Sequence, residues 1–250
     1  MKKVSDENEV MRLSKRLAYL GYCSRREADV YISRGWVMVN GIVEREKGTK
    51  VNSQDVIELL PKAKAAQKHK ITIILNKPVG YVSAQPEKGY KAASELFTEE
   101  NHWEGDQSGI EFHPKQVFGL APGGRLDIDS VGMLVLTQDG RIAKQLIGNV
   151  NKIQKEYLVR VTGAIKEKGL ELLNYGLSLD GEKLKPAKVV WQNEDQLRFV
   201  LRQGKKRQIR RMCELVGLKV IGLKRISIGN VRLNDLPLGQ WRYLSENEHF

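Results

Sequence analysis

Residues 121–137 read APGGRLDIDSVGMLVLT, a turn of small and acidic residues that runs directly into an apolar strand. A proline and two glycines come first, and glycine lets the backbone take positive φ angles and approach a ligand closely. Such a turn would hold Asp127 on a tight bend beside a sheet. In an ordinary turn, Asp127 or Asp129 would instead bond to its own backbone. The spacing alone favours the ordinary turn and does not choose between the two aspartates.

Outward from this turn, residues 71–250 predict strands and helices in mixed order. Apolar or alternating runs predict strands, and apolar residues at helical spacing predict helices. We expect strands at 71–75, 133–137, 156–162, 187–191 and 197–201, and helices at 92–97, 141–147, 166–175 and 206–216. Because they do not follow a regular βαβ order, we predict an α+β fold with a mainly antiparallel, mixed sheet. The polar stretch 98–117 is predicted to be an inserted surface loop.

The first sixty residues predict a separate small domain that begins with two helices. Leu13, Leu17 and Leu20 have the spacing of one helix face. Ser24 and Glu27 form a capping box, in which the serine oxygen accepts from an orphan N–H and the glutamate reaches back. This box should open a second helix over residues 25–33, which Gly35 can terminate.

A small sheet and a basic connection are predicted to follow these helices. We expect strands at 36–39, 42–44 and 55–60, with a type I′ turn at Asn40 and Gly41. Residues 61–70, PKAKAAQKHK, carry four lysines and no large apolar side chain. They therefore predict a linker between a domain of residues 1–60 and a domain of residues 71–250.

The charge of the chain favours a polyanionic partner. Its 250 residues carry a formal net charge of +12 and have a sequence pI near 9.6. Each phosphate that Lys or Arg neutralises releases counterions, so such a surplus favours nucleic acid. A basic soluble protein without such a partner is the plainer alternative, and charge does not separate RNA from DNA.

Several classes of protein are disfavoured by composition. No apolar run approaches the roughly 18 to 20 residues of a membrane span, and MKKVSDENEV lacks the apolar core of a secretory signal. We therefore expect a cytoplasmic protein with no membrane contact. Cys23 and Cys213 lie far apart and predict no disulfide. We expect no metal site, because no histidine has a partner at metal-ligand spacing: His69, His102, His113 and His249.

Residues 204–213, GKKRQIRRMC, predict the start of an amphipathic helix. One face would carry the apolar residues at i, i+3, i+4 and i+7, which are Ile209, Met212, Cys213 and Val216. Arg207, Arg211 and Glu214 would lie opposite in solvent. Arg210 would lie at the border, where its stem can rest on the core and its guanidinium can enter a cleft. A solvated basic face is the alternative, and it fits Arg210 less well than Arg207 or Arg211.

Residues 155–161, KEYLVRV, predict a strand whose alternation places Tyr157, Val159 and Val161 on one face. A tyrosine at the head of such a strand is more often part of the core than of a site. Its ring could instead stack on a nucleobase, as aromatic side chains do in RNA sites.

Basic residues also gather on the two predicted N-terminal helices: Arg12, Lys15, Arg16, Arg25, Arg26 and Arg34. Such a set is usually a solvated face. Here it lies beside the helix start at Ser24, whose free N–H groups also attract phosphate. The two effects together favour contact with an RNA backbone.

Together these segments resemble a known family. Residues 12–50 resemble the small αL RNA-binding domain first known from a ribosomal protein. The rest is similar to the pseudouridine synthases that modify single uridines in bacterial 16S or 23S ribosomal RNA. The matching motifs are NKPVG from Asn76, GRLDIDSVGMLVLTQDG from Gly124, KEYLV from Lys155, GKKRQIRRMCELVG from Gly204, NVRL from Asn230 and PLGQWR from Pro237.

The resemblance implies the chemistry and the roles of three residues. The family detaches uracil from ribose, turns it and rejoins it through carbon, without a metal or an organic cofactor. Its motifs place the catalytic carboxylate at Asp127, the stacking tyrosine at Tyr157 and the active-site arginine at Arg210. Arg210 would pair with Asp127 and hold its pKa down. Whether Asp127 acts as nucleophile or base stays open, and Lys77 and Pro78 are taken as structural support.

The resemblance also implies the partner, ribosomal RNA, offered as a stem-loop, as free RNA or within an assembly intermediate. The protein is expected to act as a monomer. The predicted RNA contacts are Arg12, Lys15, Ser24, Arg25, Arg26, Arg34, Arg125, Lys206 and Arg207. Two features depart from the family pattern: the stretch 98–117 is longer than expected, and Gly123 stands where a larger residue is expected.

Two other functions compete with this prediction. A catalytically idle RNA-binding or ribosome-assembly protein would explain the charge, but RNA binding needs no acidic residue such as Asp127 facing phosphate. A DNA-binding regulator would need a paired recognition helix with polar residues that read bases, and the sequence shows none.

Overall fold

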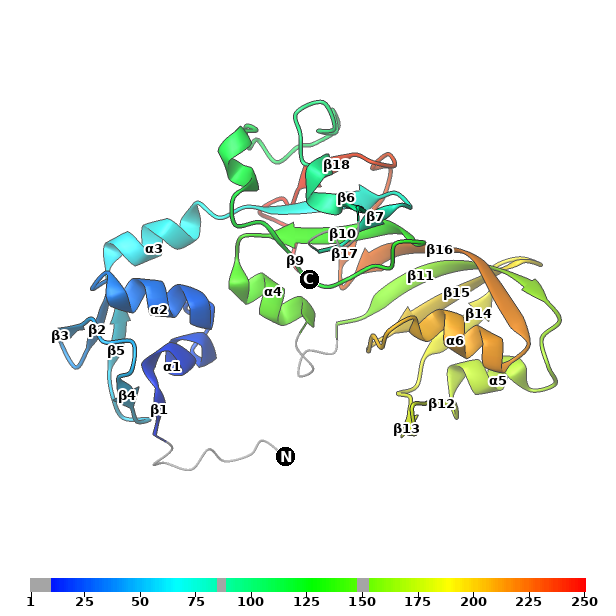
Figure 1. The fold of residues 1–250 in the computed structure, drawn as a ribbon, viewed down its shortest axis with the longest axis horizontal. Helices are drawn as coiled ribbons and strands as arrows, with labels where there is room; N and C mark the ends of the chain where they lie inside the picture. The colour runs from blue at the N-terminus through cyan, green and yellow to red at the C-terminus, as the bar shows by residue number, and fades with distance from the viewer. Residues whose placement is uncertain (1–9, 85–88, 148–152) are drawn as a thin grey trace. The chain divides into compact units, whose positions relative to one another are not determined.

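The computed structural model describes residues 10–84, 89–147 and 153–250 of the chain (Figure 1). It divides into two compact units. The smaller unit contains residues 1–71 together with 137–144, and the larger unit contains 72–136 together with 145–250.

The smaller unit packs two helices against short strands. The helices are α1 (Leu13–Tyr19) and α2 (Arg25–Ser33). A three-stranded antiparallel sheet has the order β3 (Ile42–Glu44), β2 (Val37–Val39), β5 (Ile57–Leu59), and β1 (Met11–Arg12) pairs with β4 (Lys50–Val51). The core between them contains Leu13, Leu17, Cys23, Ala28, Ile32 and Val37, all nearly or fully inaccessible to solvent.

Local sequence signals explain the ends of these elements. Ser24 caps α2: its backbone N–H donates to Glu27 Oε2 at 2.6 Å, and Glu27 N–H donates to Ser24 Oγ at 3.3 Å. The predicted capping box is therefore confirmed. Asn40 and Gly41 both have positive φ, 51° and 78°, as a type I′ turn requires between two antiparallel strands.

The predicted linker is wrong over most of its length, because Pro61–Lys68 forms a helix, α3. Proline suits the first helical turn, and the alanines that follow favour the helix. Ala63 is fully buried in the core of the smaller unit, and Gln67 Nε2 donates to the Tyr31 hydroxyl at 2.8 Å. Small alanines let the helix pack closely, so it needs no large apolar residue.

The larger unit is built on one mixed sheet (Figure 1). Its main path has the order β14 (Lys188–Trp191), β15 (Gln196–Leu201), β11 (Lys155–Gly163), β16 (Leu218–Ile228), β10 (Val131–Thr137), β6 (Thr72–Lys77), β18 (Trp241–Tyr243). Two short strands join it, β9 (Ala121–Pro122) beside β10 and β17 (Val231–Arg232) beside β16. The pairs along β14, β15, β11 and β16 are antiparallel, and β10 runs parallel to β16. The predicted α+β class with a mainly antiparallel, mixed sheet is confirmed.

The remaining elements border this sheet. They are α4 (Gly140–Ile147), α5 (Gly169–Asn174), α6 (Gln208–Leu215), the short pairs β7 (Tyr81–Val82) with β8 (Lys91–Ala92) and β12 (Ser178–Leu179) with β13 (Glu182–Lys183), and two 3₁₀ turns, η1 (Ala93–Leu96) and η2 (Pro114–Val117). The helix predicted over 92–97 is the turn η1, and the one predicted over 166–175 begins later, at Gly169.

Strand β16, the longest of the described chain, was not predicted from sequence. Two register shifts interrupt its pairing with β11, and a bulge exchanges the inward and outward positions of a strand. Lys219, Lys224 and Arg225 further break the apolar pattern, although Arg225 is buried. The alternation that predicts a strand is therefore absent from LKVIGLKRISI.

Helices α5 and α6 lie along one face of the β14, β15, β11 and β16 part of the sheet (Figure 1). The predicted apolar face of α6 is confirmed, because Ile209, Met212, Cys213 and Val216 are all buried in the core beneath it. The sheet contributes alternate residues to the same core, among them Tyr157, Val159, Val161, Leu197, Phe199 and Leu201.

The predicted surface loop 98–117 has η2 as its one regular element and is anchored on β18. His102 stacks on the fully buried Trp241 with ring centroids 4.2 Å apart. Trp241 Nε1 donates to the Thr98 carbonyl at 2.8 Å, and Tyr243 N–H donates to Asp106 Oδ2 at 2.8 Å. Aromatic packing therefore fixes the inserted loop on the edge of the sheet.

Within residues 10–84, 89–147 and 153–250, no helix has the length and apolar character to span a membrane. Among the same residues, no group of three or more His, Cys, Asp or Glu side chains is placed to hold a metal ion.

Candidate active site

The turn that carries Asp127 is fixed on both sides by hydrogen bonds. Leu126 N–H donates to Ser83 Oγ at 2.9 Å, and that hydroxyl donates to the Leu126 carbonyl at 2.6 Å. Ser130 N–H donates to the Asp127 carbonyl at 3.1 Å, which closes the turn. Leu126 is buried in the core, while the Asp127 side chain is 37% exposed. The carboxylate is therefore held at an accessible position by a rigid backbone.

Two glycines near this turn allow close packing. A Cβ on Gly123 would lie 2.6 Å from Leu146 Cδ1, so the larger residue that the family pattern led us to expect would require the Leu146 side chain to shift. Gly132 has φ of 105°, and a Cβ there would lie 2.3 Å from the Arg225 carbonyl oxygen. Gly132 therefore allows β10 and β16 to pair where the turn ends.

Arg207 faces both aspartates of the turn. Its guanidinium donates to Asp129 at 3.2 and 2.9 Å, and its Nη1 lies 3.9 Å from Asp127 Oδ2. Partial burial raises the pKa of the Asp129 carboxyl, but the hydrogen bond from Arg207 and the charges of Arg210 and Arg207 outweigh it and lower this pKa. The predicted solvent exposure of Arg207 is confirmed, since its side chain is 42% exposed, but this exposed guanidinium is paired with Asp129.

Arg210 anchors the turn rather than pairing with Asp127. Its Nη2 donates to the Asp129 carbonyl at 2.9 Å and to Ser130 Oγ at 3.2 Å, and it lies 3.1 Å from Asp129 Oδ1. Its Nη1 donates to the Val220 carbonyl at 3.3 Å. The expected border position on the helix is confirmed, since Arg210 is 9% exposed. The expected ion pair with Asp127 is wrong, because the carboxylate that Arg210 contacts is Asp129.

Arg210 keeps one polar group without a partner. Its buried Nε has no hydrogen-bond acceptor among the residues that the structure describes. A buried donor that is left unsatisfied costs free energy.

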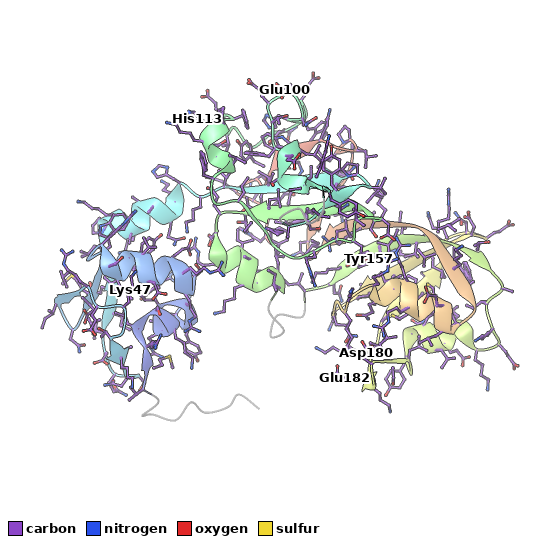
Figure 2. The ribbon with its side chains drawn as sticks, viewed as in Figure 1. Lys47, Glu100, His113, Tyr157, Asp180 and Glu182 are labelled. Carbon is purple, nitrogen blue, oxygen red and sulfur yellow. The ribbon has the colours of Figure 1, made fainter. Side chains whose placement is uncertain are left out.

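Tyr157 lies in β11, toward the middle of the larger unit (Figure 2). It is opposite Phe199 of β15 and Arg225 of β16, and it is 8% exposed. Leu126, the residue before the candidate carboxylate, belongs to the same apolar cluster as Tyr157 and Ile209 of α6. The three motifs singled out from the sequence therefore meet around one core.

Two buried cations support the turn. Lys77 is fully buried, and its Nζ donates to the carbonyls of Pro78 at 2.8 Å and Tyr81 at 3.0 Å. Burial lowers its pKa to about 8, although the charges of Asp129 and Asp127 oppose the change. Arg225 donates to the Met133 carbonyl at 2.7 Å and to the Arg125 carbonyl at 3.2 Å. The sequence analysis missed Arg225, because nothing in a single sequence marks a lysine or arginine as buried.

The predicted RNA contacts of the smaller unit are largely exposed. Arg12, Lys15, Arg25, Arg26 and Arg34 all lie at the surface, with the Arg34 guanidinium 4.9 Å from the centre of the Trp36 ring. Ser24 is half-buried, and its hydroxyl is already used as the cap of α2. In the larger unit, Arg125 and Lys206 are also exposed.

A rigid acidic turn beside arginines, on an α+β sheet and in one chain with a small basic unit, is the arrangement of an enzyme that acts on a polyanion. Residues 71–215 match the family model described as RNA pseudouridylate synthase, and residues 11–57 match the S4 domain. The chain therefore belongs to the RNA pseudouridylate synthase family and carries an N-terminal S4 domain.

Individual relatives extend over nearly the whole chain. The dual-specificity RNA pseudouridine synthase RluF of Escherichia coli strain K12 is 37% identical over 241 residues, which cover 95% of this chain and 77% of the relative. The ribosomal large subunit pseudouridine synthase B of Bacillus subtilis strain 168 is 34% identical over 244 residues, which cover 95% and 93%. A crystal structure of a pseudouridylate synthase matches with a TM-score of 0.63 at 24% identity, covers 94% of this chain and 96% of its own, and supports the fold.

Proposed function

We propose that this RNA pseudouridine synthase isomerises single uridines in ribosomal RNA, with Asp127 as its catalytic carboxylate. The observation that carries the assignment of Asp127 is the turn itself. Its backbone is fixed by Ser83 and Ser130 and holds the Asp127 carboxylate at an accessible position, 3.9 Å from Arg207, while the neighbouring Asp129 forms the closer ion pairs with Arg207 and Arg210. The name of the Bacillus subtilis relative favours RNA of the large ribosomal subunit as the first substrate to test.

The proposed chemistry needs an ionised carboxylate and a uridine turned out of its stack. Flipping a nucleotide costs a few kcal/mol, least in a loop or distorted stem. Tyr157 would stack against the extruded uracil, and Arg210 would hold the turn that carries Asp127. Asp127 would then act as nucleophile or base while uracil leaves the ribose and rejoins through carbon. No step of this chemistry is assigned to a metal or organic cofactor.

The smaller unit would dock the RNA. Phosphate contacts fix the position of RNA and carry little sequence information, which suits exposed arginines on short helices. We assign this role to the cluster of Arg12, Lys15, Ser24, Arg25, Arg26 and Arg34. In the larger unit, Arg125, Lys206 and Arg207 would contact the RNA segment that lies near the catalytic turn. We further propose that residues 1–60 form the docking domain and 71–250 the catalytic domain, joined through α3. The protein would act as a monomer on ribosomal RNA in the cytoplasm.

The decisive experiment incubates the protein with unmodified transcripts of 16S and 23S ribosomal RNA and maps every new pseudouridine. A small number of discrete sites, absent when Asp127→Asn is used, is the expected result. RNA binding without any new pseudouridine in either transcript would favour the idle RNA-binding protein instead.

A further inference from the structure

The outer face of the larger sheet carries a concave surface, away from the catalytic turn. It is a groove of about 560 Å³. Its lining comes from β14, β15, β11, β16 and β17 and the residues that flank them, and its charged members are Glu156, Lys188, Arg198, Arg202 and Arg232. Neither Asp127 nor any other residue of the catalytic turn belongs to it.

Strand alternation places this groove opposite the apolar core. Along β15, Leu197, Phe199 and Leu201 face the core under α5 and α6, so Arg198 and Arg202 point to the other side. Val200 also points to this outer face, and it pairs with Lys188 of β14 and with Glu156 of β11. Because directly paired residues share a face of the sheet, Lys188 and Glu156 lie on the outer face too. Tyr157 follows Glu156 and faces the core, so the groove and the proposed uracil-stacking ring lie on opposite faces of β11.

The groove has an uncompensated positive charge. Glu156 accepts a hydrogen bond from Arg198 Nε at 2.5 Å, which neutralises one of the four cations. Arg202 lies beside the neutral Gln154 amide, whose oxygen accepts from Arg202 Nε at 3.1 Å and from Nη2 at 2.8 Å when the amide group is turned by 180°. Within the described residues, Lys188, Arg202 and Arg232 have no carboxylate partner, and all three are exposed. Three cations therefore line one groove without an ion-pair partner, next to the ion pair of Arg198 with Glu156.

The chemistry of the lining fits the phosphates of RNA. Arg, Lys and Asn side chains are usual donors to phosphate oxygens, and Asn230 adds the amide, whereas the buried Ser227 hydroxyl donates to Glu156. Protein–nucleic acid interfaces are more polar and more positive than protein–protein interfaces, whose centres are apolar and often aromatic. The apolar lining here is limited to Pro186, Ala187 and Val200, so an acidic protein partner fits less well.

We propose that this groove is a second RNA-binding site, which holds the backbone of the substrate RNA outside the segment that enters the active site. It binds a run of phosphates through Lys188, Arg202 and Arg232 and reads no base. The inference rests on RNA being the substrate and is independent of the role of Asp127. Because the groove lies on the other face of the sheet from Tyr157, it contributes to affinity and leaves the chemical step unchanged.

The test compares two triple variants of the full chain. Lys188→Gln, Arg202→Gln and Arg232→Gln together remove the free cations of the groove. Lys115→Gln, Lys183→Gln and Lys219→Gln remove the same charge from exposed positions of the same unit outside the groove. Affinity for fluorescent poly(U) RNA and for 16S and 23S transcripts is measured at several salt concentrations, and thermal unfolding checks the fold.

In the groove variant, the slope of log affinity against log salt should be shallower by about 0.7 for each phosphate of single-stranded RNA that is no longer neutralised. At 0.1 M salt, this change corresponds to about fivefold weaker binding per phosphate. The control variant should retain more affinity, and kcat at saturating RNA should match the wild type. The single variant Arg232→Gln should show about one third of the slope change. It provides the test if the triple variant does not fold.

Equal slopes for the groove variant and the wild type, or equal losses of affinity in both triple variants, would overturn the proposal. Binding of poly-glutamate that is lost in the groove variant, with RNA affinity intact, would assign the groove to an acidic protein and overturn it as well. If no protein, including the wild type, forms pseudouridine, this result would count against the proposed function. The RNA affinities of the two triple variants would still test the groove.

Discussion

The arginines of α6 and those of the smaller unit differ in what surrounds them. On and beside α6, Arg207 and Arg210 contact Asp129, and Arg211 forms two hydrogen bonds with Asp180, at 2.9 and 2.6 Å. On the smaller unit, Arg12, Arg25 and Arg26 have no ion pair among the described residues and extend into solvent.

This difference separates two tasks that net charge cannot separate. An arginine held by a carboxylate and by backbone carbonyls has lost its conformational freedom before the substrate arrives, which favours a defined geometry at the reacting group. An unpaired surface arginine keeps its charge available to any phosphate and adapts to the path of the backbone. We therefore expect substitutions at α6 to change turnover and substitutions in the smaller unit to change affinity.

The largest effect is expected for Asp127, the carboxylate of the turn that has no ion pair shorter than 3.9 Å among the described residues. Asp127→Asn should lower turnover at least about a thousandfold while RNA affinity stays nearly unchanged, because it removes the reacting charge and keeps the shape. Asp129→Asn is the matched control, on the same turn, and should be much milder. If Asp127→Asn keeps activity within tenfold of the wild type, Asp127 is not the catalytic carboxylate. Equal losses in both variants would show that the turn itself, and not one carboxylate, was disturbed.

The next effect tests the two arginines that share Asp129. Arg210→Ala should lower kcat about a hundredfold, the loss typical of one preorganised donor, because Arg210 anchors the turn. Arg207→Ala should cost less turnover, since its side chain is largely exposed. Single-turnover rates with saturating RNA give both values. If the two variants lose the same amount of turnover, the arginines of α6 act only as a basic surface, and Arg210 has no special role in holding the turn.

A smaller effect is expected when the unpaired arginines are removed. Arg12→Gln, Arg25→Gln and Arg26→Gln together should make the slope of log affinity against log salt shallower by about 0.7 to 0.9 for each phosphate that is no longer neutralised, and turnover at saturating RNA should survive. Lys47→Gln, Lys62→Gln and Lys64→Gln remove the same charge from exposed positions of the same unit. Identical slopes for the wild type and the arginine variant would show that the cluster is solvated and binds no phosphate.

The smallest effect concerns Lys77, a buried cation held by carbonyls alone. Its folded pKa of about 8 lies below its ordinary value, so above pH 8 the unfolded chain binds more protons and stability rises with pH. The free energy of unfolding should gain about 1 kcal/mol from this group between pH 8 and 9. Urea unfolding of the wild type and Lys77→Met at both pH values measures it. The contribution is absent if both proteins change equally with pH.

Elements with a complete local signal were predicted to the residue. Helix α2 spans Arg25–Ser33 as expected, because its capping box lies within the sequence that it caps. The buried face of α6 and the inward side of β11 followed from periodicity alone. Helix α3 and strand β16 were missed, because alanines and lysines give no periodic apolar pattern and bulges interrupt alternation.

The candidate site divides in the same way. The sequence motifs selected Asp127, Tyr157 and Arg210, and the fold brings the segments that carry them to one core. The partner of Arg210 was predicted wrongly, since the choice between Asp127 and Asp129 depends on atoms that are about 80 residues apart in sequence. Spacing along one helix shows that Arg210 lies at a border, and it does not show which carboxylate lies across that border.

The sequence by itself determined those helices and strands that have a local capping or periodic signal, the basic character of both units and the family motifs, since these depend on neighbours within a few residues. Only the tertiary structure decided that Lys77 and Arg225 are buried, that Asp129 holds both arginines and that three cations line a groove behind the sheet. The physical reason is that burial and electrostatic pairing depend on distances in space. Long-range strand pairing sets these distances, and the residue types on a single strand leave them undetermined.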